Sequence, residues 1–435
     1  MYKKCFSVKK HMYIAQLLII VSIYFSCKND GVVKKDDSMY SIKVETAHLN
    51  IWSRYVNQYN ILNDFTGLDG EVSLPTPEEC HDGKINALGW WTPIENGAFF
   101  NGIYMDGLIK RWKHTKSEDD LQKIKRIASG LIYLSSISKT PGFVARGVAR
   151  DGFSHYAMSS NDQVGGWFYG LWLYLKSGLA SESERRIIET KMQEVVREIV
   201  RLKYFVPAEP PFLTRGSLGW FDHNSARLLF MFKALYSLTS DKYWSDLYSK
   251  SLSEKGGFSK KTRLEIIEDG IITDKQNINS TWDKSPSIGC LRELWELEQD
   301  TLIRNSYKKG LTISAVNVMK NIGKAYLWNP NDSTKLELDW RKLNMFWVPQ
   351  KTDKEAEELA EKQLRILYKT VQRRVFEDVN LRDPIFSAWV ITQSPDVQML
   401  KEKRKDLLKL IDYYDYSNIY HVWFFPVESI WWTLN

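Results

Sequence analysis

The stretch that decides the fold runs from residue 89 to residue 102 and reads Gly89-Trp90-Trp91-Thr92-Pro93-Ile94-Glu95-Asn96-Gly97-Ala98-Phe99-Phe100-Asn101-Gly102. Thr92 and Glu95 have the spacing of a capping box, in which Pro93 takes the first helical position. Apolar residues then keep helical spacing as far as about residue 114. The stretch therefore predicts an apolar helix over 94–114 that follows a polar loop with two tryptophans.

Three glycines, Gly97, Gly102 and Gly107, lie inside this predicted helix. Each costs roughly 1 kcal/mol of helix stability relative to alanine. A helix that accepts this cost indicates that another backbone, or a ligand, comes close to it.

From residue 42 onward the chain reads as one helix after another, and strand signals are weak. Hydrophobic periodicity predicts helices over the following ranges: 43–62, 94–114, 117–138, 161–177, 182–203, 223–239, 241–254, 286–297, 299–322, 354–376, 384–394 and 398–413.

Two kinds of helix alternate along the chain. One kind is apolar on most sides, as buried helices are, and its members begin near residues 94, 161, 223, 286 and 384. The other kind is amphipathic and charged, and it includes 117–138, 182–203 and 398–413. The alternation predicts an all-α fold, an (α/α)6 toroid of inner and outer helices, although only five inner helices are recognisable. An α-solenoid is the alternative, but it should show a repeat of fixed length, and none is seen.

The first residues have the pattern of an export signal. Four lysines precede an apolar run over 13–25, which ends at Ser26-Cys27. The run is too short for a membrane-spanning helix and is typical of a secretory signal. A small residue before cysteine resembles a bacterial lipoprotein signal, so we expect residues 1–26 to be removed and Cys27 to be lipidated. The alternative is an uncleaved membrane anchor.

This signal sets the expected domain organisation. Residues 27–41 are polar enough to form a flexible tether, and 42–435 would form one (α/α)6 catalytic domain. The domain would lie outside the cytoplasm, in the periplasm or at the cell surface, and would meet a membrane only through the lipid.

Charge and composition exclude some classes of partner. Removal of residues 1–26 takes away four lysines and lowers the formal net charge from +7 to +3. A nucleic-acid partner would need a concentrated basic face, and no run of the sequence supplies one. The seven histidines are scattered and no metal-binding motif is present, so neither a metal nor a cofactor is expected. Cys80 and Cys290 could pair in an exported protein, but sequence does not decide this.

The inner helices of a toroid would begin at one common mouth. Four of the five predicted starts carry Trp or Tyr within a few residues of a carboxylate, and tryptophan accounts for 17 of 435 residues. The C–H face of a sugar packs on aromatic rings, and its hydroxyls bond to carboxylates. The pattern therefore predicts an oligosaccharide partner. The aromatic stretch 413–432 is expected to close the ring of helices or to form one wall of the mouth.

The pattern resembles the six-hairpin glycosidase superfamily. Its (α/α)6 barrels include unsaturated glucuronyl and rhamnogalacturonyl hydrolases and several polysaccharide lyases. Segments 141–147, 151–156 and 160–163 also resemble exported lipoproteins of carbohydrate-degrading bacteria. The resemblance covers about residues 85–300 well and the remainder only in outline. It implies saccharide chemistry without a particular substrate, and no complete catalytic signature of a named member is matched.

Glu95 and Asp162 are the candidate catalytic pair, as general acid and base. A structural role would explain both: Glu95 could close the capping box of Thr92, and Asp162 follows the potential cap Ser160. Residues expected to bind substrate at the same mouth are Trp90, Trp91, Arg146, His155, Gln163, Trp220, Asp222, His223, Asn224, Trp282 and Asp283.

Some of these residues have competing interpretations. Arg146 could bind a uronate carboxylate or could pair with Asp151. Asp222 could be a helix cap, whereas Asp283 lies before the expected cap Ser285 and is not needed for capping.

The function that these residues favour is hydrolysis of a glycosidic bond, with an acid for the leaving oxygen and a carboxylate for water or the sugar. One alternative is a polysaccharide lyase on the same fold. It would use Tyr or His as the base, and Arg146 or Asn224 would neutralise the carboxylate of a uronate. Another alternative is a non-catalytic glycan-binding lipoprotein.

Overall fold

The computed structural model describes residues 37–272 and 281–435. Its contacts divide the chain into Met1–Ile42 and Lys43–Asn435, and the fold described below is that of the second unit. The predicted signal peptide and Cys27 lie outside the described residues. Residues 37–41, expected to belong to the tether, are helical. No described helix is both long and apolar enough to cross a membrane.

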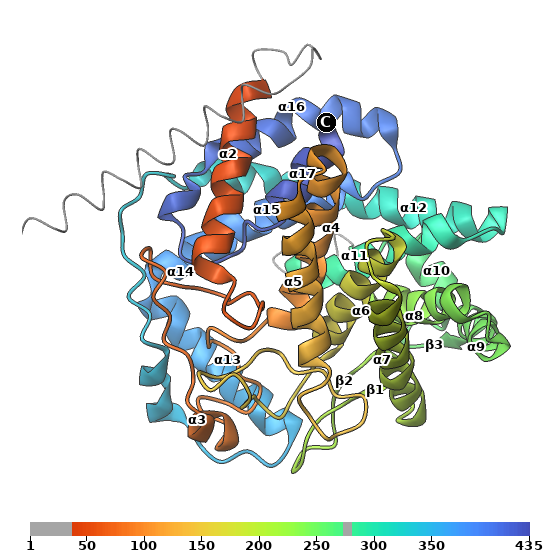
Figure 1. Cartoon of the computed structure of the whole chain (residues 1–435), viewed down its shortest axis with the longest axis horizontal. Helices are drawn as coiled ribbons and strands as arrows, with labels where there is room; N and C mark the ends of the chain where they lie inside the picture. Colours follow the sequence, from red (N-terminus) through yellow and green to blue (C-terminus); the bar gives the residue numbers. More distant parts are fainter. Residues whose placement is uncertain (1–36, 273–280) are drawn as a thin grey trace, which may run out of the picture. The chain divides into compact units, whose positions relative to one another are not determined.

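Helices dominate the described residues, so the predicted all-α class is confirmed (Figure 1). The α-helices are α2 (Asp37–Asn50), α3 (Pro77–His81), α4 (Gly97–Thr115), α5 (Glu118–Leu134), α6 (Asn161–Lys176), α7 (Glu182–Arg201), α8 (Asn224–Thr239), α9 (Lys242–Ser253), α10 (Arg263–Glu268), α11 (Thr281–Leu297), α12 (Thr301–Val318), α13 (Asp353–Thr370), α14 (Gln372–Phe376), α15 (Asp383–Thr392), α16 (Val397–Tyr413) and α17 (Val427–Leu434).

Shorter elements complete the described part of the chain. Two small antiparallel pairs are formed by β1 (Phe205–Pro207) with β2 (Thr214–Ser217) and by β3 (Lys255–Gly256) with β4 (Lys261–Thr262). The 3₁₀ and π helices are η1 (Ile51–Tyr55), η3 (Met319–Leu327), η4 (Trp340–Phe346), η5 (Glu377–Arg382) and η6 (Tyr416–Asn418).

The contact between α4 and α6 is made possible by glycines. A Cβ atom added to Gly102 would lie 1.9 Å from the carbonyl oxygen of Gly166, and one added to Gly170 would lie 2.5 Å from the Cα atom of Gly102. The two backbones therefore touch where any side chain would keep them apart. The prediction that the helix near residue 94 tolerates its glycines for close approach is confirmed at Gly102.

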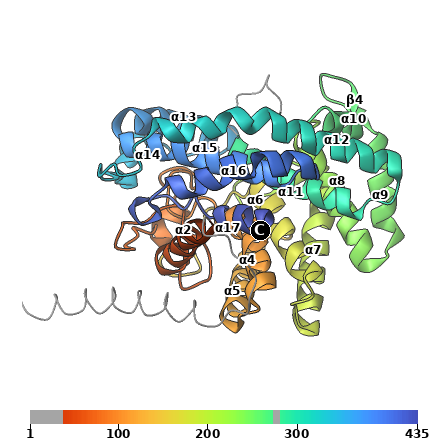
Figure 2. The same cartoon turned by 90° about the horizontal axis from the view of Figure 1, so that it is seen from above.

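The most buried helices contact one another in a continuous series. α4 packs on α6, α6 on α8 and α11, and α8 on α11. α11 then contacts α15, α15 contacts α17, and α17 packs back against α4. Figures 1 and 2 both place α11, α15 and α17 toward the middle of the helical unit and α9 at its edge.

The amphipathic helices behave as predicted. α5 buries Ile124, Ile127 and Leu131 against α4 and α6, whereas its charged face is turned outward. α7 and α13 begin with complete capping boxes, Ser181 with Glu184 and Thr352 with Glu355. Local sequence thus starts these helices, and one apolar face attaches them to the buried ones.

Three predicted helix starts are wrong. The helix expected from 43 already begins at Asp37, as α2. α4 begins at Gly97 rather than at 94, because Thr92 donates its hydroxyl to the carbonyl of Gly89 and does not cap a helix. The helix expected from 286 already includes Thr281, and Pro286 lies inside it. Ser285 is therefore not a cap.

Candidate active site

A cavity of about 90 Å³ lies where α4 and α6 begin, and it brings together parts of the chain that are far apart in sequence. Its lining residues are Trp90, Trp91, Glu95, Asn96, Asp162, Trp282, Arg374, Arg382 and Trp423. The candidate acid and base thus share one cavity. Typical ligand clefts measure roughly 300–1,000 Å³, so this cavity would hold the reacting part of a substrate rather than a whole oligosaccharide.

Glu95 is held in the loop before α4. Trp91 adopts a φ of 71°, and its amide donates to Glu95 Oε2 at 2.7 Å. Burial raises the pKa of Glu95, and the positive charge of Arg374 and the Trp91 amide offset this only in part. Glu95 is therefore biased toward its protonated form, as a general acid should be.

A second buried acid, Asp64, stands next to Glu95 and was not indicated by the sequence. Its carboxylate accepts hydrogen bonds from the amide of Asn96 at 2.9 Å and from Asn96 Nδ2 at 2.6 Å. Burial and the negative charge of Glu95 raise the pKa of Asp64 well above its ordinary value. Two neighbouring buried carboxyls resist double ionisation, because the negative charge of one disfavours ionisation of the other.

Asp162 has the opposite electrostatic environment. It lies in the first turn of α6, where the hydroxyl of Ser160 donates to Asp162 Oδ1. Burial alone would raise the pKa of Asp162, but the positive charges of Arg146 and Arg227 and the Ser160 hydroxyl lower it below its ordinary value. Asp162 is therefore ionised, as a base or nucleophile should be.

Aromatic rings and arginines form the walls of the cavity. Trp282 and Trp423 lie with ring centroids 5.5 Å apart, and Arg382 lies 5.0 Å from the first ring and 5.1 Å from the second. Arg374 lies 5.2 Å from the ring of Trp91. Arg374 is nine-tenths buried, and its Nε and Nη1 atoms have no hydrogen-bond partner among the described residues.

The two arginines come from α14 and η5, and neither of them was among the residues predicted for the site. Arg374, Asp378 and Arg382 are spaced four residues apart and form a ladder of ion pairs, at 3.6 Å and 3.4 Å. This spacing was the signal available in the sequence. Asp378 stays ionised because, against the effect of burial, Arg382 and Arg374 lower its pKa.

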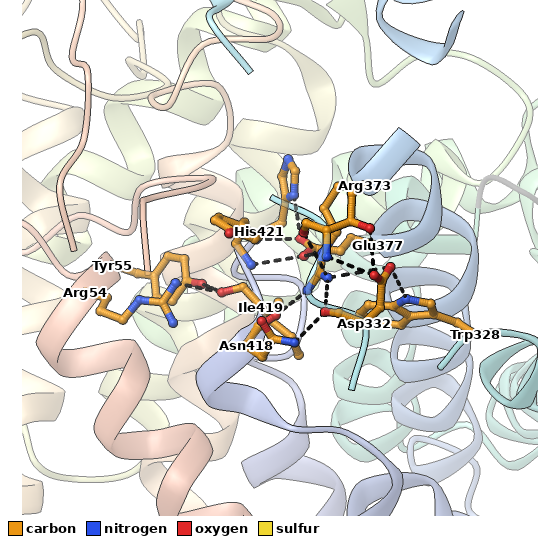
Figure 3. A network of polar contacts seen from close by, with 11 residues as sticks. Arg54, Tyr55, Trp328, Asp332, Arg373, Glu377, Asn418, Ile419 and His421 are labelled. Carbon is orange, nitrogen blue, oxygen red and sulfur yellow. Dashed lines mark hydrogen bonds and ion pairs between the residues drawn. The ribbon is translucent and has the colours of Figure 1, made fainter. Parts of the chain in front are cut away.

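The other face of the same segment anchors it to the C-terminal stretch (Figure 3). Glu377 is fully buried and accepts from Arg373 Nε at 2.8 Å and from the amide of His421 at 2.8 Å, and its Oε2 lies 2.7 Å from His421 Nδ1. Arg373 also donates to the carbonyls of Asp332 and Asn418. This network fixes the segment that carries the cavity arginines.

Two residues predicted to bind substrate, Arg146 and Gln163, do not line the cavity and form hydrogen bonds within the protein. Arg146 donates to the carbonyls of Glu95, Met158 and Ser159, and makes no pair with Asp151. Gln163 accepts from the amide of Phe99 at 3.1 Å and donates to Asn96 Oδ1 at 2.9 Å. Both residues tie the beginnings of α4 and α6 together.

The predicted group at the start of α8 does not line this cavity. Trp220 is 47% exposed. Asn224 accepts from Asn161 at 2.9 Å and from Arg227 at 3.0 Å, and donates to Asp222 at 2.8 Å. Burial and Arg227 lower the pKa of His223 to about 3, so its imidazole is neutral.

Asp283 and His155 also lie outside the lining. Asp283 belongs to the first turn of α11, and burial raises its pKa to about 6. Its Oδ1 atom is buried without a hydrogen-bond partner among the described residues. His155 faces Glu209 at 3.2 Å, and its Nδ1 lies 2.8 Å from the carbonyl of Phe153.

Cys80 and Cys290 are both buried free thiols and do not form a disulfide. Within residues 37–272 and 281–435 no group of His, Cys, Asp and Glu side chains has an arrangement that could hold a metal ion. Comparison of the chain with protein-family models, with curated proteins and with solved structures finds no match.

Proposed function

We propose that the chain is a glycoside hydrolase that acts on an oligosaccharide, with Glu95 as general acid and Asp162 as base or nucleophile. One observation carries the proposal: two carboxylates share a cavity with tryptophan walls, and their surroundings shift their pKa values in opposite directions. A pair of carboxyls separated in this way can divide acid and base work at one pH.

The proposed substrate carries a negative charge, such as a uronate. Arg374 and Arg382 both line the cavity, and two guanidinium nitrogens of Arg374 form no hydrogen bond with the described residues. A guanidinium binds a carboxylate through two parallel hydrogen bonds, which fixes the orientation of a sugar ring. Tryptophan faces beside these arginines would pack on the C–H face of the same ring.

We further propose the (α/α)6 toroid as the architecture. The series of contacts through α4, α6, α8, α11, α15 and α17, with α17 packed back on α4, supports a closed inner ring. In this arrangement α17 supplies the sixth inner helix, which the sequence did not identify.

Export as a lipoprotein is part of the same proposal. It rests on the sequence of residues 1–27, in which an apolar run ends at Ser26-Cys27. A lipid on Cys27 would hold the enzyme at a bacterial membrane, in the periplasm or at the cell surface, where oligosaccharides released from polymers are encountered.

The two alternatives differ in their products. The lyase version relied on Arg146 or Asn224, and both side chains are engaged in hydrogen bonds within the protein. A lyase would release a product with a new double bond that absorbs in the ultraviolet. A glycan-binding protein would release no product.

The test is a screen of plant and host oligosaccharides, including unsaturated uronate oligosaccharides, with products resolved by chromatography. We expect hydrolysis of an acidic oligosaccharide by the natural protein. Loss of a general acid or base lowers rates by typically 10²–10⁴-fold, so Glu95→Gln and Asp162→Asn should each show such a loss with the fold intact. Asp222→Asn, outside the cavity, is the matched control and should retain turnover. Two variants that are destabilised but fully active would show that Glu95 and Asp162 are structural residues.

A further inference from the structure

A second and larger cavity, of about 450 Å³, lies along the C-terminal halves of α4, α6 and α11. Its floor includes Asp106, Tyr169 and Glu293, one residue from each helix. Asp106 lies nine residues beyond Gly97, the first residue of α4, which is roughly 14 Å along a helix rising 1.5 Å per residue, whereas Glu95 precedes that helix. The two cavities share no lining residue.

Asp106 and Glu293 each accept hydrogen bonds from the described residues through only one of their two carboxylate oxygens. Asp106 Oδ2 accepts from Lys110 at 2.9 Å and from Ser429 at 2.5 Å, whereas Oδ1 accepts no hydrogen bond from the described residues. Glu293 Oε2 accepts from Trp172 and Lys176, both at 2.7 Å, and Oε1 likewise accepts none.

The hydroxyl of Tyr169 is also unpartnered. Tyr169 is 1% exposed and lines the cavity, and its hydroxyl, which forms no hydrogen bond with a described residue, is not among the fully enclosed polar atoms. Burial and the charges of Asp106 and Glu293 raise the pKa of Tyr169 well above its ordinary value, so the hydroxyl keeps its proton. A hydroxyl that is open to a cavity and has no partner in its walls is free to bond with a polar ligand that occupies it.

The remaining lining describes that occupant. The acids are matched by bases, with Lys110 on Asp106, Lys176 on Glu293 and Arg292 on Glu296 at 2.9, 2.7 and 2.8 Å. Lys113 is the one further charged residue of the lining, so three acids face four bases. This near balance favours a neutral ligand over a highly charged one. Ile109, Leu173 and Trp295 add apolar surface to the same walls. Hydrogen-bond acceptors, donors and apolar surface in one cleft suit a polyhydroxylated molecule.

We propose that this cavity is a second saccharide site, which binds a neutral mono- or disaccharide away from the carboxylates of the first cavity. Its volume lies within the range of small-molecule clefts, unlike that of the first cavity. The free oxygens of Asp106 and Glu293 accept from sugar hydroxyls, and the Tyr169 hydroxyl donates to one. The site does not depend on hydrolysis, since an inactive protein would bind the same sugar.

The test uses the full chain and ligand-observed NMR with titration calorimetry. The probes are glucose, galactose, rhamnose, cellobiose, maltose and lactose. We expect saturable binding of at least one probe, weakened about tenfold in Tyr169→Phe and abolished in Leu173→Trp, which fills the cavity. Tyr174→Phe, the same change on the same helix outside the cavity, is the matched control and should bind normally.

Asp162→Asn alters the first cavity only, so it distinguishes binding there from binding in the second cavity. This variant should leave the binding of the neutral sugar unchanged. The proposal is overturned if no probe binds, or if Tyr169→Phe binds like the natural protein. It is also overturned if Asp162→Asn removes the signal, because the sugar would then occupy the first cavity. Circular dichroism checks that each variant is folded, and Tyr169→Phe, which keeps the ring, decides the outcome should Leu173→Trp fail to fold.

Discussion

At the scale of single residues, the candidate site depends on what surrounds each charge. Glu95 and Asp162 both precede or begin a helix, and both could be read as helix caps. The structure gives them different surroundings: at Glu95 burial outweighs the nearby positive charge and raises the pKa, whereas at Asp162 Arg146 and Arg227 outweigh burial and lower it. The two carboxyls are therefore pushed toward opposite protonation states.

Arg374 gives the first prediction at this scale. Arg374→Gln removes a buried guanidinium that lines the cavity, and hydrogen bonds to charged groups contribute about 1.5–3 kcal/mol. We expect the KM for an acidic oligosaccharide to rise by about tenfold or more, with a smaller effect on kcat. Steady-state kinetics of Arg374→Gln beside Arg365→Gln, an exposed arginine of α13, measure this. An unchanged KM for Arg374→Gln would remove the arginine from substrate recognition.

Sequence predicted part of this site and missed another part for a physical reason. Trp90, Trp91, Glu95, Asp162 and Trp282 were found because aromatic and acidic residues stand out beside helix starts, and all of them line the cavity. The arginines and Asp64 were missed because their role depends on tertiary placement.

The wrong assignments have a similar cause. The start of α8 has the same aromatic and acidic character as the others, but its groups bond to one another and to Asn161. Composition alone does not show which polar groups are already satisfied within the protein.

At the scale of elements, the contact between α4 and α6 is the most sensitive packing feature. Gly102→Ala would place a methyl group against the carbonyl of Gly166 and force the helices apart. Overpacking of this kind costs typically about 1–3 kcal/mol, occasionally more. Chemical denaturation should show this loss, whereas Gly323→Ala, which meets no atom within 4 Å, should change stability little. Equal stability of the two variants would contradict the observed contact.

The buried network of Glu377, which holds α14 and η5 to the C-terminal stretch, gives a prediction about the pH dependence of stability. Burial opposes ionisation of Glu377, but His421 and Arg373 outweigh it and lower its pKa. A lowered pKa stabilises the folded state above the unfolded value of about 4.3. That stability is lost as the pH falls through the folded pKa. Denaturation curves between pH 7 and pH 3 should show a steeper loss for the natural protein than for Glu377→Gln. Parallel curves would contradict it.

Glu377→Gln should also be less stable at pH 7, since removing one partner of a buried ion pair costs about 3–5 kcal/mol. The matched change Glu357→Gln, at a half-exposed ion pair with Arg215, should cost far less.

At the scale of the whole molecule, the helical class followed from periodicity, because buried and amphipathic helices differ in composition along their whole length. Helix α17 was not predicted from periodicity, since it has only eight residues and lies in an aromatic stretch without a charged face. Trp423, in the same stretch, lines the cavity.

Location in the cell is predicted at this scale as well. Cys27→Ala should prevent lipidation and leave the protein unprocessed or free of membranes. Membrane fractionation and the mass of the mature protein measure this, with Cys80→Ala as the control at a buried thiol. Unchanged fractionation and mass for Cys27→Ala would contradict the prediction that Cys27 carries a lipid.

The central claim is that Glu95 works as the acid and Asp162 as the base of one hydrolytic site. The most direct measurement is the pH dependence of kcat/KM on the acidic oligosaccharide found by screening. We predict a bell-shaped profile, in which activity falls at high pH as Glu95 loses its proton and at low pH as Asp162 gains one. Glu95→Gln, with the residual rate measured in the same way, should lose the high-pH limb and keep the low-pH limb. A Glu95→Gln profile with both limbs intact would contradict the assignment of the acid.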